Sequence, residues 1–341
     1  MYERLCLYYP RHSPTLSSVY TGIGHKESTM IDILRVTNLP TYLMSDLQQT
    51  YIVHDRDHIT DPSALQRIRA IVGGGDAVID KKLMSLFPAL EFISICGVGY
   101  DGVDVIGAME RGIKVSHTPG VLNDDVADLA LGLMLSIARR IPQADKFVRN
   151  SDWVEGPFPL QTKMSGARLG LVGIGRIGQA IAKRAAAFDM SIAYYARHAV
   201  PTLPYTYFPS AKELAANVDY LVAIIPGGPT TRNLINAEVF QALGNKGYFI
   251  NVARGSVVDQ AALIDALQKK VIGGAALDVY ADEPRVPAEL RNLQNVVLTP
   301  HVASATVQTR QAMAALALAN LNAHFEGQAI PALVPEWANR V

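Results

Sequence analysis

Three ionisable side chains in the second half of the chain each follow a short apolar run that is typical of a buried strand. Arg254, Glu283 and His301 come shortly after three successive runs of this kind. Parallel strands bring their carboxyl ends to one edge of a sheet, and ligands of such sheets bind at that edge. We therefore expect the guanidinium, the carboxylate and the imidazole to converge on one site.

These three groups suit the reduction of a small 2-keto acid. Arg254 can bind the substrate carboxylate through paired N–H groups and polarise the keto oxygen. His301 can donate the proton because imidazole titrates near neutrality, and Glu283 beside it would favour the imidazolium and orient the ring. Each residue alone could have a role without catalysis. Arg254 could be a solvated charge, His301 an ordinary polar side chain, and Glu283 a turn residue before Pro284. Only their joint position favours catalysis.

A glycine-rich segment predicts a binding site for a dinucleotide, which could supply the hydride. Gly173, Gly175 and Gly178 have the spacing G-x-G-x-x-G between an apolar run at 168–172 and a helix-forming run at 179–185. The first glycine permits a tight turn, the second lets the backbone approach a pyrophosphate, and the third lets helix and strand pack closely. A glycine-rich turn without a ligand is the alternative, but the strand and helix on either side favour a dinucleotide-binding loop.

The residues around this loop indicate which dinucleotide binds. The amides of Arg176 and Ile177 are expected to face the phosphates at a helix N-terminus. An NAD-binding domain usually places Asp or Glu at the end of the next strand to hold the ribose 2′-OH, whereas this chain has Ala196, Arg197 and His198. Ala196 removes the repulsion that a 2′-phosphate would meet, and Arg197 can pair with that phosphate. The sequence favours NADP(H) and leaves NAD(H) open, the alternative being that Arg197 is a solvated loop residue.

Two series of alternating strands and helices position these residues. The first series has apolar runs at 31–36, 69–72, 91–96 and 113–116. The second has runs at 168–172, 191–195, 220–225, 248–251, 274–277 and 296–298. Strands separated by helices predict parallel sheets, so we expect an α/β protein with two Rossmann-like, doubly wound domains and an active-site cleft between them.

The series also predict the domain boundaries. Residues 30–126 and 308–341 are expected to form a flavodoxin-like substrate-binding domain, and residues 127–307 a dinucleotide-binding Rossmann domain. Residues 1–29 show no regular period and are expected to be an extension without a catalytic role, or a terminal arm packed on the surface. No apolar signal-peptide region follows the charges at the start of this segment.

Two long helices are expected to connect the domains. One covers residues 123–150, with Asn123 as its N-cap and two aspartates in its first turn, and Pro142 is expected to kink or split it. The other covers residues 305–325 and is expected to return to the first domain.

Composition excludes several classes of function. The 341 residues include 31 basic and 31 acidic side chains, so no overall field favours nucleic acid or an anionic membrane. The apolar run at 129–138 is far shorter than the roughly 20 residues of a membrane span. Two cysteines, Cys6 and Cys96, form neither a disulfide framework nor a cysteine-rich metal site. We expect a cytoplasmic protein that binds a small molecule, with no metal, nucleic-acid or membrane partner.

Taken together, these motifs resemble the D-isomer-specific 2-hydroxyacid dehydrogenase family from about Met30 to the C-terminus. Within that family the chain is most similar to the NADPH-dependent glyoxylate/hydroxypyruvate and hydroxyphenylpyruvate reductases. The resemblance rests on the segments 97–101 (GVGYD), 172–178 (VGIGRIG), 251–255 (NVARG), 277–279 (LDV) and 299–301 (TPH). It implies the roles given above for Arg254, Glu283 and His301, and a D-2-hydroxy acid as product.

The resemblance also implies further site residues. Asp278 would hold the nicotinamide carboxamide, and Pro226 and Thr231 would line the cofactor groove. Trp153 would enter the active site of a partner subunit in a homodimer, or only pack at the dimer interface. The amides of three residues would grip the substrate carboxylate: Gly75, Val98 and Gly99.

Two other functions fit the same motifs. An NAD-dependent phosphoglycerate or D-lactate type of dehydrogenase would share the fold, although the missing carboxylate at Ala196 argues against it. A nucleotide-sensing corepressor, as in the C-terminal-binding proteins, could keep much of the catalytic set, but neither a partner-docking extension nor a basic patch is evident in the sequence. Among substrates, glyoxylate and hydroxypyruvate lead, with 2-ketogluconate and aryl pyruvates as further candidates.

Overall fold

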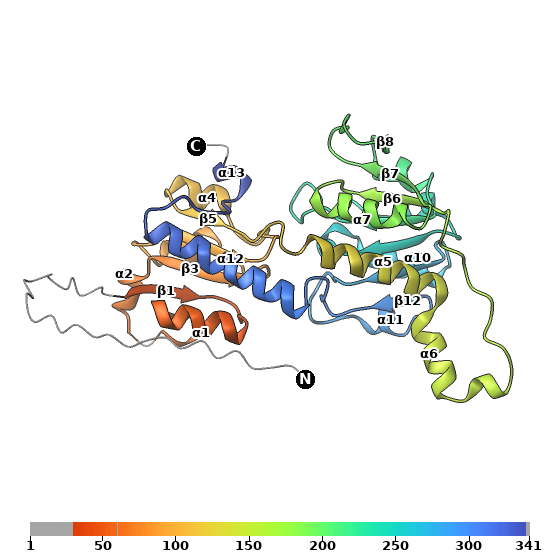
Figure 1. The fold of residues 1–341 in the computed structure, drawn as a ribbon, viewed down its shortest axis with the longest axis horizontal. Coiled ribbons are helices and arrows are strands. Elements are labelled where there is room, and N and C mark those ends of the chain that lie inside the picture. The colour runs from red at the N-terminus through yellow and green to blue at the C-terminus, as the bar shows by residue number, and fades with distance from the viewer. Residues whose placement is uncertain (1–29, 60, 339–341) are drawn as a thin grey trace, which may run out of the picture. The chain divides into compact units, whose positions relative to one another are not determined.

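The computed structural model describes residues 30–59 and 61–338, so the predicted N-terminal extension lies outside the described residues. The described chain forms two parallel β-sheets with helices along their faces (Figure 1). This arrangement confirms the predicted α/β class with two doubly wound sheets. The predicted domain boundaries at 126/127 and 307/308 fall near the starts of the two long helices described below and stay predictions.

The first sheet has the flavodoxin-like strand order β2-β1-β3-β4-β5, with every neighbouring pair parallel. Its strands are β1 (Ile31–Arg35), β2 (Tyr51–Asp55), β3 (Ala70–Gly74), β4 (Phe92–Cys96) and β5 (Lys114–Ser116). The segments between them are α1 (Thr41–Thr50), η1 (Arg56–His58), α2 (Ala64–Arg67), α3 (Lys81–Ser85) and α4 (Val105–Glu110). The strand order reverses between β1 and β3, so the glycine-rich end of β3 lies at the edge where ligands of such sheets bind.

The second sheet is also parallel throughout and has the order β12-β11-β10-β9-β6-β7-β8. Its strands are β6 (Arg168–Val172), β7 (Ser191–Tyr195), β8 (Thr206–Phe208), β9 (Tyr220–Ala223), β10 (Tyr248–Asn251), β11 (Gly274–Leu277) and β12 (Val296–Leu298). The connecting helices are α7 (Arg176–Ala186), α8 (Ala211–Ala215), α9 (Ala237–Leu243), η3 (Gly255–Val257), α10 (Gln260–Gln268) and α11 (Ala288–Arg291). Here the strand order reverses between β6 and β9, beside the glycine loop that follows β6.

The long helix predicted at 123–150 is split into α5 (Asn123–Arg139) and α6 (Ile141–Arg149). The break lies at Arg140, which has left-handed backbone angles (φ 50°, ψ 45°), and Pro142 then occupies the first turn of α6. Proline is tolerated there because the first N–H groups of a helix have no partner inside it. The predicted cap was wrong by one residue: the N-cap is Leu122, which offers no side-chain acceptor, and Asn123 is already helical.

The helix α12 (Val307–Phe325) packs on the first sheet, which confirms its predicted return. The Ser94 hydroxyl of β4 donates a 3.1 Å hydrogen bond to the carbonyl of Ala317, and the Tyr51 hydroxyl donates one of 2.6 Å to Asn322. A short helix, α13 (Pro335–Ala338), follows it.

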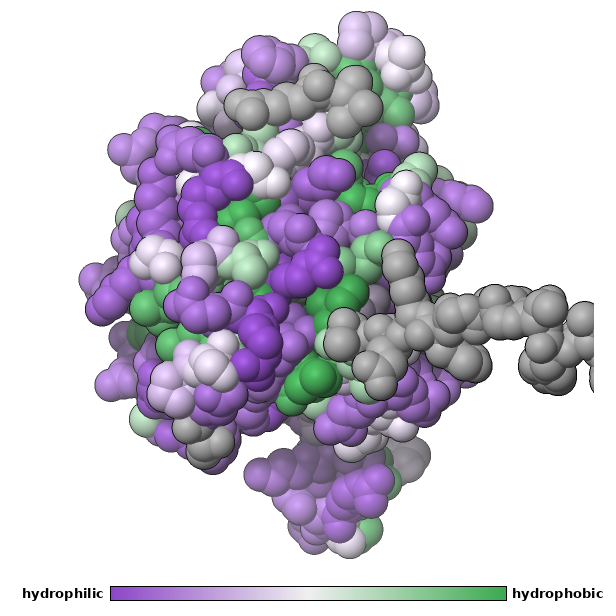
Figure 2. Space-filling view, turned by 90° about the vertical axis from the view of Figure 1, so that its left-hand side faces the viewer, coloured by the Kyte–Doolittle hydropathy of each residue, from purple (hydrophilic) through white to green (hydrophobic). Residues whose placement is uncertain are grey.

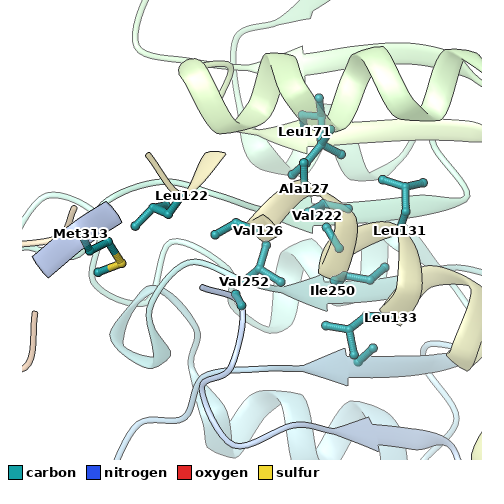
Figure 3. Close-up of a cluster of buried hydrophobic side chains, with 14 of the residues drawn as sticks. Leu122, Val126, Ala127, Leu131, Leu133, Leu171, Val222, Ile250, Val252 and Met313 are labelled. Atoms are coloured by element: carbon teal, nitrogen blue, oxygen red, sulfur yellow. The ribbon is translucent and has the colours of Figure 1, made fainter. Parts of the chain in front are cut away.

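The core beside the second sheet is built by α5, whose apolar side chains lie against strands of that sheet (Figure 3). Val126, Leu131 and Leu133 of the helix belong to the same buried cluster as Val222 of β9 and Ile250 of β10. Each fully buried side chain of this size stabilises the fold by about 1.5–3 kcal/mol relative to its exposed state. This packing fixes the strand ends that carry the candidate site.

The surface differs sharply from this core. On the face drawn in Figure 2, hydrophilic side chains predominate and hydrophobic ones form small separate patches. Among the helices of the described residues, none is long and apolar enough to cross a membrane.

Candidate functional site

The buried side chain of Asn251 makes two hydrogen bonds that hold the turn after β10, and this turn carries Arg254. The Asn251 side chain accepts from the N–H of Ala253 (3.0 Å) and donates to the carbonyl of Arg254 (3.1 Å). Asn251 is only 1% exposed, so these bonds form away from water. The adjacent Gly255 leaves no room for a side chain, because a Cβ there would overlap the carbonyl of Tyr280. The turn of Arg254 is therefore packed against the segment that leads to Glu283.

Glu283 and His301 form a direct pair at the ends of neighbouring strands. The Nδ1 atom of His301 lies 2.7 Å from Oε2 of Glu283, and the other carboxylate oxygen accepts from the N–H of Tyr280 at 2.9 Å. With Nδ1 engaged by a carboxylate, Nε2 is the ring nitrogen left to face a ligand. Side-chain exposure of 45% for His301 and 33% for Glu283 leaves the pair open on one side.

Arg254 acts on the same pair through its charge. Partial burial raises the pKa of Glu283, but the hydrogen bonds from His301 and from the N–H of Tyr280, with the positive charges of His301 and Arg254, outweigh it. The net result is a pKa of Glu283 below its usual 4.5, so the carboxylate stays ionised near neutral pH. The structure thus brings Arg254, Glu283 and His301 into one site.

A buried aspartate holds the turn that carries His301. Asp278 is fully buried, and its carboxylate accepts from the Thr299 hydroxyl (2.7 Å) and from the N–H groups of Val302 (2.8 Å) and Ala303 (2.9 Å). Its carbonyl accepts from the N–H of His301 at 2.8 Å. The predicted contact between Asp278 and a nicotinamide carboxamide stays a prediction, since its carboxylate here faces the backbone of the His301 turn.

A pocket of about 280 Å³ opens beside the pair. Glu283 and His301 line it together with mainly apolar side chains from the segments around β11 and β12, and Arg291 adds one positive charge. The site therefore combines ionised groups with an adjoining apolar space.

Two loops of the first sheet lie side by side at the substrate position that the resemblance implies. A Cβ on Gly75 would lie 3.3 Å from the carbonyl oxygen of Gly99, and a Cβ on Gly97 would lie 2.9 Å from the Cα of Gly75. The backbone of Val98 is fixed by a hydrogen bond, because its carbonyl accepts from Nδ1 of His117 at 3.0 Å. Gly99 also lies against the guanidinium of Arg254. The structure thus brings the three residues that are predicted to bind the substrate carboxylate close to Arg254, which is predicted to bind the same group.

The glycine loop has the geometry that its three roles require. Gly173 has φ 110°, which side chains rarely adopt, and a Cβ on Gly178 would overlap the carbonyl of Gly173. Gly175, by contrast, has open space where a Cβ would stand. Arg176 and Ile177 are the first two residues of α7, so their N–H groups have no partner inside the helix. The loop therefore offers an accessible cradle for an anion.

The segment after β7 contains no carboxylate next to this cradle. Arg197 and His198 are exposed, and Ala196 is half-buried. After β9, on the other side of the point where the strand order reverses, the hydroxyl of Thr231 donates a 2.8 Å hydrogen bond to the carbonyl of Pro226 and closes the turn. These features fit a dinucleotide that carries a 2′-phosphate. An acidic side chain at this position would repel the phosphate, whereas open space and cationic side chains can accommodate it.

Trp153 lies apart from these groups, in the short helix η2 (Asp152–Val154) that follows α6. Its side chain is 68% exposed, and none of the nine residues of α6 is buried. Trp153 is therefore a surface residue of the described chain. The helix α6 that precedes it extends away from the second sheet (Figure 1).

Sequence reasoning gave no role to two residues that shape the site. Asn251 fixes the turn of Arg254, and Asp101 accepts a hydrogen bond from its Nε. Both were visible within the motifs 251–255 and 97–101. However, their partners depend on loop conformations that residue spacing does not encode.

The chain is similar over most of its length to known proteins that are named as reductases. The profile described as "D-isomer specific 2-hydroxyacid dehydrogenase, NAD binding domain" matches residues 131–303. The chain is 47% identical over 312 residues to hydroxyphenylpyruvate reductase from Plectranthus scutellarioides, covering 89% of this chain and 98% of that protein. It is 45% identical over 305 residues to glyoxylate/hydroxypyruvate reductase A from Arabidopsis thaliana, covering 88% and 97%.

A solved structure is similar over nearly the whole chain. The NADPH-dependent glyoxylate/hydroxypyruvate reductase from Sinorhizobium meliloti, in complex with NADP and malonate, superposes with a TM-score of 0.85 at 43% identity. The superposition covers 90% of this chain and 98% of that one.

Proposed function

The chain belongs to the D-isomer specific 2-hydroxyacid dehydrogenase family, and we propose that it is an NADPH-dependent reductase of small 2-keto acids. Glyoxylate and hydroxypyruvate are the leading substrates, with aryl pyruvates and 2-ketogluconate as further members of the same class. The observation that carries the proposal is the 2.7 Å pair of Glu283 and His301 in the field of Arg254. The names of the relatives support the same reaction.

The reaction divides among the three side chains. NADPH, when bound, supplies the hydride that adds to the keto carbon. Arg254 binds the substrate carboxylate and polarises the keto oxygen through N–H groups that have no partner among the described residues. His301 gives the proton from Nε2 to that oxygen, because its Nδ1 is engaged by Glu283. Glu283 orients the ring and offsets the positive charge that the ring carries before the transfer.

Substrate binding would add the backbone N–H groups of Gly75, Val98 and Gly99 to the grip on the carboxylate. Two features support this part of the proposal: the close approach of the two glycine-rich loops and the position of Gly99 against Arg254. Amides and a guanidinium converging on one carboxylate would fix the keto carbon for attack from one face, which a D-specific product requires.

The cofactor proposal is NADP(H), with NAD(H) as the weaker alternative. The accessible N-terminus of α7 would bind the pyrophosphate, and Arg197 with His198 would bind the 2′-phosphate. The NADP named in the complex of the Sinorhizobium meliloti relative supports this choice.

A substrate panel with one variant tests the function. We expect the purified protein to oxidise NADPH in the presence of glyoxylate or hydroxypyruvate, with a higher kcat/KM than with NADH. His301→Ala should lower kcat by at least about 100-fold, since general acid catalysis is worth roughly that much, and should leave NADPH binding intact. Reduction at the wild-type rate by His301→Ala would refute the role of His301. Cofactor binding without turnover of any 2-keto acid would favour a nucleotide sensor instead.

The proposal extends to assembly and location. We propose a homodimer in which α6 and the exposed Trp153 contact the partner, supported by the absence of buried residues among the nine of α6. We also propose a cytoplasmic location and the domain limits 30–126 with 308–341, and 127–307. Sedimentation as a monomer at assay concentration would contradict the dimer, and fractionation of the source cells tests the location.

A further inference from the structure

Among the described residues, the guanidinium of Arg254 has partners for two of its N–H groups. Its Nε donates to Oδ1 of Asp101 at 3.1 Å, and its Nη1 donates to the carbonyl of Ala253 at 2.8 Å. Guanidinium has five N–H groups in one plane, so three of them remain for a ligand. Two bonds from different nitrogens of a planar group determine the orientation of its plane, and with it the direction of the remaining N–H groups.

The Asp101–Arg254 pair fills a slot between two glycines. A Cβ on Gly99 would overlap Nη2 of Arg254 and would lie 3.1 Å from Oδ1 of Asp101. A Cβ on Gly227 would lie 2.8 Å from Oδ2 of Asp101 and 3.2 Å from Cγ of Arg254. Neither glycine has left-handed backbone angles, so the requirement at these positions is for space. Nη2 therefore lies against the backbone of the loop that is proposed to bind the substrate carboxylate.

Asp101 is itself held by a well-anchored loop. The N–H of Val103 donates to the carbonyl of Tyr100 at 2.9 Å, and the N–H of Ile79 donates to the carbonyl of Gly102 at 2.9 Å. The hydroxyl of Tyr100 donates to Glu336 at 3.1 Å. The bonds on both sides of Asp101 restrict its backbone, so its carboxylate is a fixed acceptor.

Partial burial strengthens the pair. The side chains are 26% and 27% exposed for Arg254 and Asp101. A hydrogen bond between charged groups that are mostly shielded from water is worth more than one on an open surface.

We propose that Asp101 is a positioning residue: it holds Nε of Arg254 so that Nη2 faces Gly99 and the substrate carboxylate. The inference rests on the proposed function only for the identity of the anion. A rival interpretation of the same contact is that Asp101 competes with the substrate for Arg254. The two interpretations predict opposite kinetic effects when the Asp101 carboxylate is removed.

Two substitutions and one matched control separate these interpretations. Asp101→Ala removes the acceptor, whereas Asp101→Asn keeps an oxygen that can accept from Nε. Asp104→Ala is the control, because Asp104 lies three residues away and its side chain, within the described part of the chain, accepts only from the N–H of Gly107 (2.9 Å) at the start of α4. It should lower the melting temperature without changing the kinetics.

We expect Asp101→Ala to lower kcat/KM for glyoxylate or hydroxypyruvate by about 100-fold, the scale of loss for a misplaced anchoring group, with unchanged NADPH affinity. Asp101→Asn should recover activity to within about tenfold of wild type, because a neutral hydrogen bond is weaker than a charged one. A lower KM with undiminished kcat in Asp101→Ala would show competition and overturn the proposal. Equal losses in Asp101→Ala and Asp104→Ala would reduce the role to loop stability.

A measurement on the protein without substrate keeps this test independent of the reaction. In a ¹H–¹⁵N spectrum of arginine side chains, the Nε–H of Arg254, assigned with Arg254→Lys, should exchange slowly in wild type and in Asp101→Asn and rapidly in Asp101→Ala. An unchanged signal in Asp101→Ala would overturn the inference. If wild type reduces no 2-keto acid, the proposed function fails, and this signal still decides the role of Asp101.

Discussion

Replacing Glu283 by glutamine tests the proposed acid–base pair with the smallest change in shape. Both carboxylate oxygens of Glu283 act as acceptors, one from Nδ1–H of His301 (2.7 Å) and one from the N–H of Tyr280 (2.9 Å). Glutamine has one oxygen and one NH₂ group. One of the two donors must therefore face another donor, whichever way the amide is turned.

The size of the effect follows from this mismatch. If the amide oxygen turns to Tyr280, its NH₂ faces Nδ1 and selects the form of His301 without a proton on that nitrogen, which is the form without charge. If the oxygen turns to His301, the N–H of Tyr280 loses its partner at a cost of about 1–3 kcal/mol. Because the pair is partly exposed and water can relieve some of this cost, we take about 1.5–2 kcal/mol, which corresponds to a loss of roughly 10- to 30-fold in kcat/KM.

Steady-state kinetics with NADPH and glyoxylate between pH 5.5 and 8 measure this loss. Since the pKa of Glu283 lies below its usual 4.5, its carboxylate stays charged throughout that range, so the wild-type pair is not weakened by protonation of Glu283 at any pH of the comparison. Asp282→Asn is the matched control, because Asp282 is the neighbouring residue and pairs on the surface with Arg285. A Glu283→Gln enzyme within twofold of wild type, or an equal loss in Asp282→Asn, would refute the reasoning.

Two further predictions concern the cofactor and pH. Arg197→Ala should raise KM for NADPH about tenfold, as expected for one charge-assisted hydrogen bond, and leave KM for NADH unchanged; equal changes for both cofactors would exclude a contact with the 2′-phosphate. Burial lowers the pKa of His117 below its usual 6.5; the nearby positive charge of Arg176 adds to this, and the bond to the Val98 carbonyl opposes it. The unfolded chain therefore binds this proton more tightly, so the free energy of unfolding should fall as pH drops through 6.5 toward the lower folded pKa. Melting temperatures between pH 7.5 and 5 should fall less for His117→Asn than for wild type, and parallel curves would contradict the prediction.

The sequence predicted the buried strands more accurately than the edge strands, for a physical reason. Central parallel strands are covered on both faces and read as continuous apolar runs. Accordingly, the predicted bounds of the central strands β6, β10 and β11 match the structure. The bounds of β12 match as well, because this edge strand consists of three apolar residues without a polar interruption. The strands β2 and β8 were missed; they lie at sheet edges, where His54, Asp55 or Thr206 interrupt the apolar pattern.

Some residues of the candidate site could be predicted from the sequence and others could not. Arg254, Glu283 and His301 could be proposed from the sequence because each follows a strand, and strand ends converge in a parallel sheet. The partner of Arg254 could not be proposed, since Asp101 is 153 positions away and belongs to the other sheet's loops. Spacing along the chain says nothing about how two such loops meet.

The turn of His301 shows how the fold prepares the proton donor before any ligand binds. His301 has φ 52°, a left-handed conformation that costs a residue with a side chain about 1 kcal/mol or more. Asp278 compensates, because its buried carboxylate accepts from the hydroxyl of Thr299 and from the N–H groups of Val302 and Ala303, each bond being charge-assisted and worth about 1.5–3 kcal/mol. The same three donors satisfy a charge that would otherwise be costly to bury. The strain at His301 and the buried charge at Asp278 therefore depend on each other, and a neutral residue at position 278 would release the turn and the orientation of the imidazole together.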